Sequence, residues 1–256
     1  MIACEKMNSE HQIERMSRGF FLSGGPTACL LIHGLCGTPA ELIPLGQYLH
    51  RQGCSVRGML VAGHGTTLRD LDHSRWQDWV RSAEEAYRTL RAEHETVYVI
   101  GHSMGAALAL HLAEQFDPAG VALLAPALFL TFRFSAASIR SRFSAHTPFL
   151  PLTIPPDKLV YVRGYKSSSR HGRLELRKLS AFVRKTLSQV TAPILVVHSV
   201  YDDVVGMRNA ACIMTGVSSS LKKQRILVQS GHMIQLDRES DVVFAEISGL
   251  ISGLPG

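Results

Sequence analysis

Short apolar runs of strand length recur along the chain, and within each run the apolar residues are nearly continuous rather than alternating with polar ones. Continuous apolar runs are typical of strands that are buried on both faces of a parallel sheet. The pattern therefore predicts a series of buried parallel strands. They are expected at residues 28–33, 54–60, 97–101, 120–125, 194–199 and 225–229.

Helical patterns separate these runs. Residues 38–52 begin with Thr38-Pro39, an N-cap residue followed by proline at the first helical position. Residues 75–94 interleave charged side chains with large apolar ones, and residues 103–116 are rich in alanine and leucine, which favour helices. The alternation of strands and helices predicts an α/β protein with a parallel sheet.

The alternation stops near the middle of the chain, and a long stretch passes before the next clear strand pattern. A loop of that length without structure of its own is uncommon in a compact domain. We therefore expect an inserted cap subdomain over residues 126–190, with helical stretches near 136–143 and 173–187 and a proline-rich piece between them. Residues 1–125 and 191–256 would then form the core.

The strongest chemical signal is the segment Gly101-His102-Ser103-Met104-Gly105. It fits the pattern G-x-S-x-G, which is weak alone but here lies between a predicted strand and a predicted helix. A serine on such a sharp turn needs small residues two positions to either side. The turn lifts the hydroxyl clear of the sheet, at the positive end of a helix. The context predicts that Ser103 is a nucleophile.

A nucleophilic serine needs a base, and the base needs an acid that orients it. His232 follows the predicted strand at 225–229, and Asp202 and Asp203 follow the one at 194–199. Loops after the carboxyl ends of parallel strands are where α/β sheets carry their sites. We therefore expect His232 to be the base and one of the two aspartates to be the acid.

Acyl transfer also needs donors for the oxyanion that develops on the substrate. The backbone N–H of Met104 is one candidate because Met104 directly follows the serine. The N–H of Leu35 is the other, in the glycine-containing loop after the strand at 28–33. Cys36 lies in the same loop and is interpreted as a small loop residue, since no matching base is near it in the sequence.

Together these segments resemble the α/β-hydrolases of the bacterial carboxylesterase and monoacylglycerol lipase family. The resemblance extends over most of the chain between residues 28 and 250, apart from the insert. The stretches that carry it are LLIHGLCGTPAEL, AGHGTTLRDL followed by WQDW, VIGHSMG, APILVVHSVYDDVV and SGHMIQLDRESDVVFAEI.

The resemblance implies an α/β-hydrolase fold, with a mostly parallel sheet, helices on both faces and an inserted, mostly helical cap. It implies that Ser103 is the nucleophile, Asp202 the acid and His232 the base. Asp202 is preferred to its neighbour because the family pattern is an aspartate, any residue and two apolar residues. Leu35 and Met104 would supply the oxyanion hole through their backbone N–H groups.

Several positions depart from the family pattern without removing a catalytic group. Ala106 stands where a second glycine is frequent, Gly206 where a proline often follows, and Cys36 where threonine is frequent. The Gly63-His64-Gly65 turn matches one that the family uses structurally. Trp76 and Trp79 are expected to pack a helix rather than to stack on a ligand.

The predicted cap differs chemically from the rest of the chain. The whole chain has 27 basic and 21 acidic residues, but residues 126–190 contain twelve basic residues against two acidic ones. Three interpretations stay open: a solvated basic face, attraction to anionic lipid or a negatively charged substrate, and docking of an acidic acyl carrier protein. Nucleic-acid binding is not expected, because no groove-reading motif is present.

The same segment is rich in phenylalanine. Its apolar side chains would shelter an acyl chain above the serine, form the cap's own small core, or do both. The phenylalanines of this group are Phe129, Phe132, Phe134, Phe143 and Phe149.

Composition narrows the remaining possibilities. No apolar run approaches the roughly 18–20 residues of a membrane span, and the N-terminal stretch has no apolar core typical of a secretory signal. The five cysteines include no pair with C-x-x-C spacing, which favours free thiols. We therefore expect a cytoplasmic protein that needs no metal or cofactor.

These observations predict a serine carboxylic-ester hydrolase of the carboxylesterase or monoacylglycerol lipase type. Its substrates are expected to be short- to medium-chain acyl esters, cleaved through an acyl-enzyme. The alternatives are an esterase or thioesterase acting on an acyl chain held by an acidic carrier, and an acyltransferase with the same triad. A non-catalytic binding protein is disfavoured, because it would not need to keep all three of Ser103, Asp202 and His232.

Overall fold

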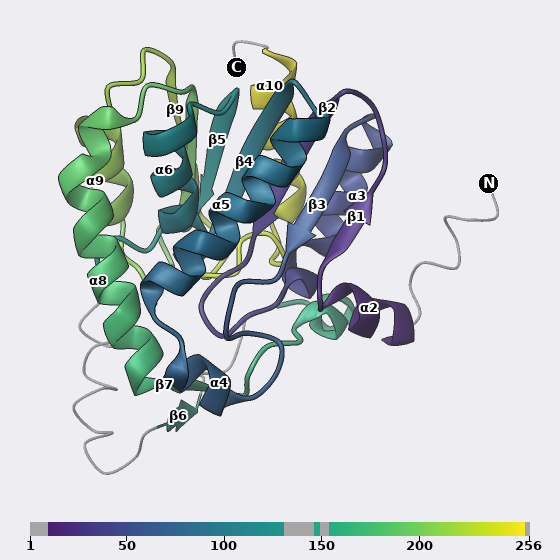
Figure 1. Cartoon of the computed structure of the whole chain (residues 1–256), viewed down its shortest axis with the longest axis vertical. Helices are drawn as coiled ribbons and strands as arrows, with labels where there is room; N and C mark the ends of the chain where they lie inside the picture. Colours follow the sequence, from purple (N-terminus) through teal and green to yellow (C-terminus); the bar gives the residue numbers. More distant parts are fainter. Residues whose placement is uncertain (1–9, 131–145, 149–153, 254–256) are drawn as a thin grey trace.

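The structure is a computed structural model that describes residues 10–130, 146–148 and 154–253 (Figure 1). The expected helix near 136–143 lies outside the described residues. So do most of the phenylalanines of the predicted cap: Phe132, Phe134, Phe143 and Phe149.

A seven-stranded sheet forms the centre of the molecule, in the order β1-β3-β2-β4-β5-β8-β9. Strand β1 pairs antiparallel with β3, and the other neighbours pair in parallel. The mostly parallel sheet predicted from the apolar runs is therefore confirmed. The strands are β1 (Phe20–Leu22), β2 (Thr27–Ile32), β3 (Ser55–Met59), β4 (Thr96–His102), β5 (Gly120–Leu124), β8 (Ile194–Ser199) and β9 (Lys222–Leu227).

Burial explains which strands the sequence revealed. Every residue of β5 and β8 is buried, and so are all but the first of β2, which is why these strands are continuous apolar runs. The two edge strands are different. Strand β1 was not predicted, and β9 begins at Lys222 rather than at 225 as expected. Strand β9 carries exposed polar side chains, so hydrophobicity marks its bounds poorly, whereas β1 is apolar but only three residues long.

Helices cover both faces of the sheet (Figure 1). Helices α3 (Ile43–Arg51) and α10 (Ser240–Ser252) contact each other on one face. Helices α5 (Trp76–Glu93), α6 (Met104–Phe116) and α8 (Arg170–Thr186) pack together on the other. The described residues also form helices α2 (Glu10–Met16), α4 (Leu68–His73) and α9 (Arg208–Gly216).

The single helix expected at 38–52 is divided in two. A 3-10 helix, η2 (Pro39–Leu42), precedes α3, and Thr38 is extended before it with no hydrogen bond from its hydroxyl to the helix. Pro44 has no N–H to bond a carbonyl one turn earlier, so a continuous α-helix would lose a bond at that point. The prediction that Thr38 caps the helix with its side chain is wrong, because its hydroxyl makes no hydrogen bond to the helix. A helical segment does begin at the next residue, as expected.

The segment between β5 and β8 occupies the place of the predicted cap. It contains β6 (His146–Pro148) paired antiparallel with β7 (Ser167–Ser169), the 3-10 helices η4 (Pro156–Tyr161) and η5 (Leu187–Gln189), and helix α8. The hydroxyl of Ser169 accepts a hydrogen bond from the Gly172 N–H and caps α8, which therefore starts earlier than the sequence suggested. The buried face of α8 belongs to the main hydrophobic core.

No helix within the described residues is long and apolar enough to cross a membrane. The four cysteines in that part of the chain, Cys29, Cys36, Cys54 and Cys212, are all free thiols.

Candidate active site

Ser103 lies on a tight turn between strand β4 and helix α6. Its backbone has φ 55° and ψ −111°, a strained conformation for a residue with a side chain. A Cβ atom on Gly101 would lie 2.1 Å from the Gly105 carbonyl oxygen, and one on Gly105 would lie 2.1 Å from the Ile32 carbonyl oxygen. Both contacts are with backbone atoms, so only glycine lets the turn close and α6 approach the sheet.

The side chains of Ser103, His232 and Asp202 form a continuous hydrogen-bonded chain. His232 Nδ1 lies 2.8 Å from Asp202 Oδ2, and His232 Nε2 lies 3.0 Å from Ser103 Oγ. An ionised carboxylate only accepts hydrogen bonds, so Nδ1 carries the proton and donates it. Nε2 is then the acceptor for the serine hydroxyl. The structure therefore brings together three residues that are far apart in the sequence.

Backbone and side-chain donors surround the Asp202 carboxylate. Its Oδ1 accepts hydrogen bonds from the N–H groups of Val204 and Val205, each at 2.9 Å. On the other side, His198 Nε2 lies 3.5 Å from Oδ2. Burial alone would raise the pKa of Asp202, but the electrostatic interaction with His232 and the hydrogen bonds from His198, His232 and Val205 outweigh it and hold the pKa well below its ordinary value.

The neighbouring carboxylate has a different environment. Asp203 is exposed, whereas Asp202 is buried and contacts His232. The choice between the two aspartates, which the residues alone left open, therefore favours Asp202 on geometry.

The loop that contains Leu35 lies directly against the serine. A Cβ on Gly34 would lie 3.3 Å from Ser103 Cβ. The Gly34 carbonyl oxygen accepts hydrogen bonds from His33 Nδ1 at 2.8 Å and from the Gly37 N–H at 3.1 Å. In a trans peptide the C=O and N–H point in opposite directions. Fixing the Gly34 carbonyl therefore also fixes the direction of the Leu35 N–H.

The imidazole of His33 is held in one tautomer. Its Nε2 accepts a hydrogen bond from the Val61 N–H at 3.1 Å, so Nδ1 is the nitrogen that carries the proton. Burial, with help from the nearby His64, lowers the pKa of His33 well below its usual value and keeps the ring neutral. The other predicted donor, Met104, is the first residue of α6 and is fully buried.

A segment from the region of the predicted cap is attached to the same loop. The Tyr165 N–H donates to the Cys36 carbonyl oxygen at 2.8 Å, and the Tyr165 hydroxyl donates to the Gly63 carbonyl oxygen at 2.9 Å. Cys36 has φ 66° and is buried. Burial raises the pKa of its thiol to about 12, so the thiol stays protonated. That state disfavours a nucleophilic role for Cys36.

The Gly63-His64-Gly65 turn and the two tryptophans occupy structural positions. The two glycines have φ of 76° and 70°, and the His64 ring stacks on that of Tyr165 with a centroid distance of 6.3 Å. Trp79 is fully buried and donates from Nε1 to Ser74 Oγ. Trp76 packs on the Phe182 ring.

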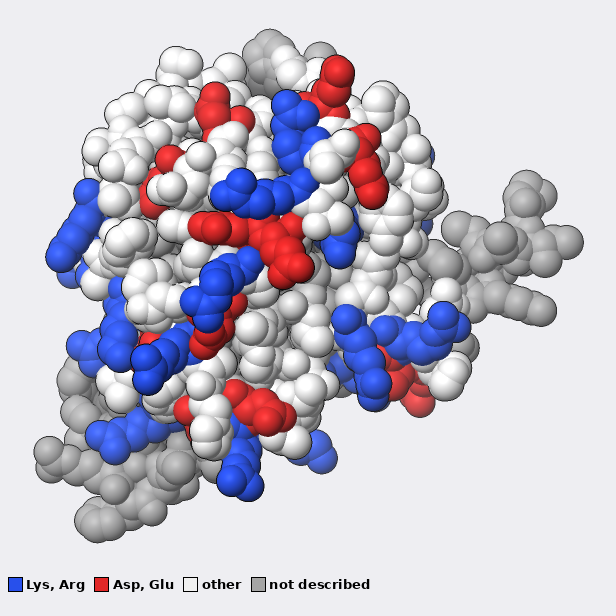
Figure 2. All heavy atoms as spheres, in the orientation of Figure 1, with Lys and Arg blue, Asp and Glu red and all other residues white. Residues whose placement is uncertain are grey.

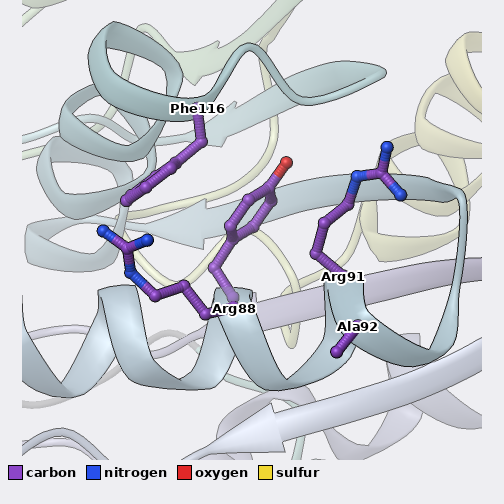
Figure 3. Close-up of a pocket in the computed structure, with 5 residues that line it drawn as sticks. Arg88, Arg91, Ala92 and Phe116 are labelled. Atoms are coloured by element: carbon purple, nitrogen blue, oxygen red, sulfur yellow. The ribbon is translucent and has the colours of Figure 1, made fainter.

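A surface pocket lies elsewhere, between α5 and the end of α6 (Figure 3). The Arg88 guanidinium lies 4.5 Å above the centre of the Phe116 ring, and Tyr87 stacks on the same ring. Phe116 is the last residue of α6, whereas Ser103 precedes its first. A helix of 13 residues is about 20 Å long. This pocket is therefore distant from the triad side chains.

Sequence reasoning missed four buried polar side chains around this site: His33, Glu41, His102 and His198. Each interrupts or closely follows an apolar run. A polar residue that is buried must find a hydrogen-bond partner, so a lone polar residue in such a run is a usable signal.

Comparison with known proteins gives a consistent result. The sequence pattern of the family described as serine aminopeptidase, S33, matches residues 26–239. The chain is 29% identical over 239 residues to the thermostable monoacylglycerol lipase of Bacillus sp. (strain H-257), covering 93% of this chain and 95% of that protein. It is 26% identical to the carboxylesterase of Bacillus subtilis (strain 168), covering 89% of this chain and 93% of that protein.

The fold matches solved structures as well. A structure from work on "LipS and LipT, two metagenome-derived lipolytic enzymes" superposes with a TM-score of 0.84 at 24% identity, covering 93% of this chain and 98% of that one. The crystal structure of the Paleococcus ferrophilus monoacylglycerol lipase has a TM-score of 0.73 at 17% identity. These likenesses confirm the predicted α/β-hydrolase fold.

Proposed function

The chain belongs to the serine aminopeptidase, S33, family and is a carboxylic-ester hydrolase, and we propose that Ser103, His232 and Asp202 are its catalytic residues. The observation that carries the proposal is the hydrogen-bonded chain from Ser103 Oγ through the His232 ring to Asp202, with distances of 3.0 and 2.8 Å. Nucleophile, base and orienting acid are within the reach that covalent catalysis requires.

The proposed reaction proceeds in two halves. His232 Nε2 takes the proton of Ser103 Oγ as the oxygen attacks the ester carbonyl carbon. The backbone N–H groups of Leu35 and Met104 stabilise the tetrahedral oxyanion. When the intermediate collapses, the carbon–oxygen bond to the alcohol breaks and His232 returns the proton to the leaving oxygen. Water then hydrolyses the acyl-enzyme by the same steps.

We infer that the substrates are short- to medium-chain acyl esters, including monoacylglycerols. The support is the pair of relatives, one a monoacylglycerol lipase and the other a carboxylesterase, each matched over about nine-tenths of this chain.

The basic residues of the predicted cap support a carrier protein or an anionic lipid less than the relatives support a small-molecule ester. Several of those described are engaged within the protein: Arg173 is buried, Lys178 bonds to Glu175, and the Arg184 guanidinium lies over the Phe129 ring. Lys158 donates to Ser240 Oγ. On the face shown in Figure 2, basic and acidic residues are interspersed. We therefore keep a small-molecule ester as the proposed substrate.

The test is hydrolysis of p-nitrophenyl esters from acetate to palmitate, together with release of glycerol from monoacylglycerols. Ser103→Ala and His232→Ala are expected to lower kcat by roughly 10³–10⁶-fold while the fold is kept. Ser188→Ala and His73→Ala change exposed residues of the same types and should retain the wild-type kcat. A triad variant that kept most of its activity would overturn the assignment. A chain-length optimum at palmitate would overturn the proposed substrate class.

A further inference from the structure

Two buried polar side chains that take no part in the proposed reaction lie behind the catalytic residues. His102 directly precedes Ser103 and is 3% exposed. Glu41 belongs to η2, after the loop of the proposed oxyanion hole, and is 5% exposed. A carboxyl group and an imidazole at such depth are costly unless they serve each other or a neighbour.

One nitrogen of His102 holds the loop of the proposed base. Its Nε2 lies 3.1 Å from the backbone carbonyl oxygen of His232. A carbonyl oxygen can only accept, so Nε2 carries the proton and donates it. Burial lowers the pKa of His102 to about 3, so the ring is neutral and its Nδ1 is a bare acceptor. The tautomer of His102 is therefore fixed by its bond to His232.

The carboxyl group of Glu41 faces this bare nitrogen. Within the described residues His102 Nδ1 has no hydrogen-bond partner, and Glu41 Oε2 lies 3.9 Å from it. An ionised carboxylate would place one acceptor opposite another, whereas a protonated carboxyl would offer a donor. Burial raises the pKa of Glu41 to about 8, although a hydrogen bond from the Thr38 backbone acts in the opposite direction. Near neutral pH the carboxyl group is therefore protonated.

The same pair supports the loop of the proposed oxyanion hole. A Cβ on Gly37 would lie 2.2 Å from Glu41 Oε1, and one on Gly34 would lie 3.1 Å from His102 Nδ1. Both glycines therefore pack directly on the pair. A negative charge on Glu41 would lie behind the loop where the substrate oxyanion develops. In a buried site of low dielectric, that charge would oppose the oxyanion.

We propose that Glu41 and His102 are positioning residues that form a neutral acid–imidazole pair. The Glu41 O–H donates to His102 Nδ1 when the two atoms close from the 3.9 Å of this structure to hydrogen-bond distance, and His102 Nε2–H holds the His232 backbone. The proposal rests on the proposed roles of Ser103 and His232. One proton, held by Glu41, then keeps the base loop and the oxyanion loop in place together. When Glu41 loses this proton, a carboxylate faces the imidazole lone pair and the positioning is lost.

The other titratable groups that face the pair lie on the surrounding elements. They are His232 and Asp202 beside His102, Cys36 beside Glu41, and His33. The high pKa of the Cys36 thiol and the low pKa of His33 leave both neutral between pH 7 and 10. Ionisation of Glu41 lowers activity on the alkaline side.

The test is the pH dependence of kcat for a p-nitrophenyl ester in the wild type and in Glu41→Gln. The wild-type kcat is expected to fall above about pH 8, where Glu41 ionises. The glutamine amide can donate to His102 Nδ1 but cannot ionise. Glu41→Gln should therefore keep kcat within a few-fold at pH 7 and lose the alkaline fall. Glu41→Leu and His102→Leu should lower kcat by roughly 10–100-fold, with a smaller change in KM, because they remove the positioning bonds.

Glu84→Gln is the matched control. Glu84 also contacts a histidine, His111, at 3.2 Å, but on the α5–α6 interface. Its pH profile should match the wild type, and circular dichroism at each pH excludes unfolding as the cause of a fall. A wild type with no alkaline fall, or a Glu41→Gln profile that keeps it, overturns the proposal. So does a Glu41→Leu variant with wild-type kcat.

A spectroscopic measurement separates this proposal from the proposed function. An active-site-directed fluorophosphonate labels a reactive serine without a cognate ester, so absence of both hydrolysis and labelling of Ser103 would overturn the function alone. Nitrogen-15 NMR of the His102 ring then tests the pair. Protonated Nε2 and an Nδ1 signal that shifts between pH 7 and 9.5 in the wild type, but not in Glu41→Gln, are expected. An Nδ1-protonated ring would overturn the pair.

Discussion

Two adjacent carboxylates follow strand β8, and their surroundings differ. Asp202 is buried, accepts two backbone N–H groups and contacts His232, whereas Asp203 is exposed. The two positions offer a matched pair for testing which carboxylate orients the base.

Asp202→Asn is expected to lower kcat by roughly 10⁴-fold, because an amide that donates to the ring selects the wrong tautomer of His232. Asp203→Asn should change kcat by no more than a few-fold. Steady-state kinetics on a p-nitrophenyl ester, with thermal unfolding to verify the fold, measures both. Equal losses in the two variants would contradict the assignment of Asp202.

At the scale of elements, the predicted cap segment lies very close to the loop of the proposed oxyanion hole. A Cβ on Gly164 would lie 2.3 Å from the Cys36 carbonyl oxygen and 3.0 Å from Gly37 Cα. Both are backbone atoms, so one of the two segments would have to move. The next residue, Tyr165, donates its N–H to that same carbonyl. A shift of the Gly164 backbone would therefore also move the loop that contains Cys36.

Gly164→Ala is therefore expected to lower kcat about tenfold or more and to destabilise the fold by about 1–3 kcal/mol through overpacking. Gly249→Ala is the control, because nothing lies within 4 Å of a Cβ at that position of α10. It should leave kcat unchanged and stabilise the helix by about 0.5–1 kcal/mol. Steady-state kinetics and denaturant unfolding of the two variants test this prediction. An unchanged kcat in Gly164→Ala would rule out the contact as a support for the loop.

At the scale of the whole molecule, buried titratable groups make stability depend on pH. Burial lowers the pKa of His33 well below 6.5, that of His64 to about 4 and that of His102 to about 3. It raises the pKa of Glu41 from 4.5 to about 8. Between pH 4.5 and 6.5 the three histidines are protonated in the unfolded chain but not in the folded chain. Glu41 is protonated in the folded chain but not in the unfolded chain. The unfolded state therefore binds a net two protons more from these groups.

The free energy of unfolding is accordingly expected to fall by about 2.7 kcal/mol for each pH unit below 6.5. Between pH 6.5 and 8 the raised pKa of Glu41 makes stability fall as pH rises, by up to about 1.4 kcal/mol per unit. The raised pKa of His111 acts in the same direction, whereas the lowered pKa of the Cys54 thiol, about 7, acts in the opposite direction. Urea unfolding across this range measures both slopes. Glu41→Gln should remove the contribution of Glu41 to the alkaline slope, up to about 1.4 kcal/mol per pH unit, and the exposed control His73→Gln should change neither slope. A stability independent of pH between 4.5 and 6.5 would contradict the buried neutral histidines.

Much of this molecule follows from local sequence. Continuous apolar runs identified the buried strands, because residues buried on both faces must all be apolar. The small residues around Ser103 marked the turn, because backbone atoms approach there within about 2 Å of where a Cβ would stand. The His232 loop was located by the strand before it.

Other features were decided only by the tertiary structure. Edge strand β1 is apolar but only three residues long, and so short a run has no period that marks it as a strand. Asp202 and Asp203 are the same residue type at adjacent positions, and only the fold brings Asp202 into contact with His232. Glu41 and His102 are separated in the sequence by three helices and strand β3, so no sequence pattern relates them. Local chemistry determined the elements and the residue types proposed for catalysis. Protonation, orientation and pairing depend on burial and on long-range contacts, which exist only in the folded chain.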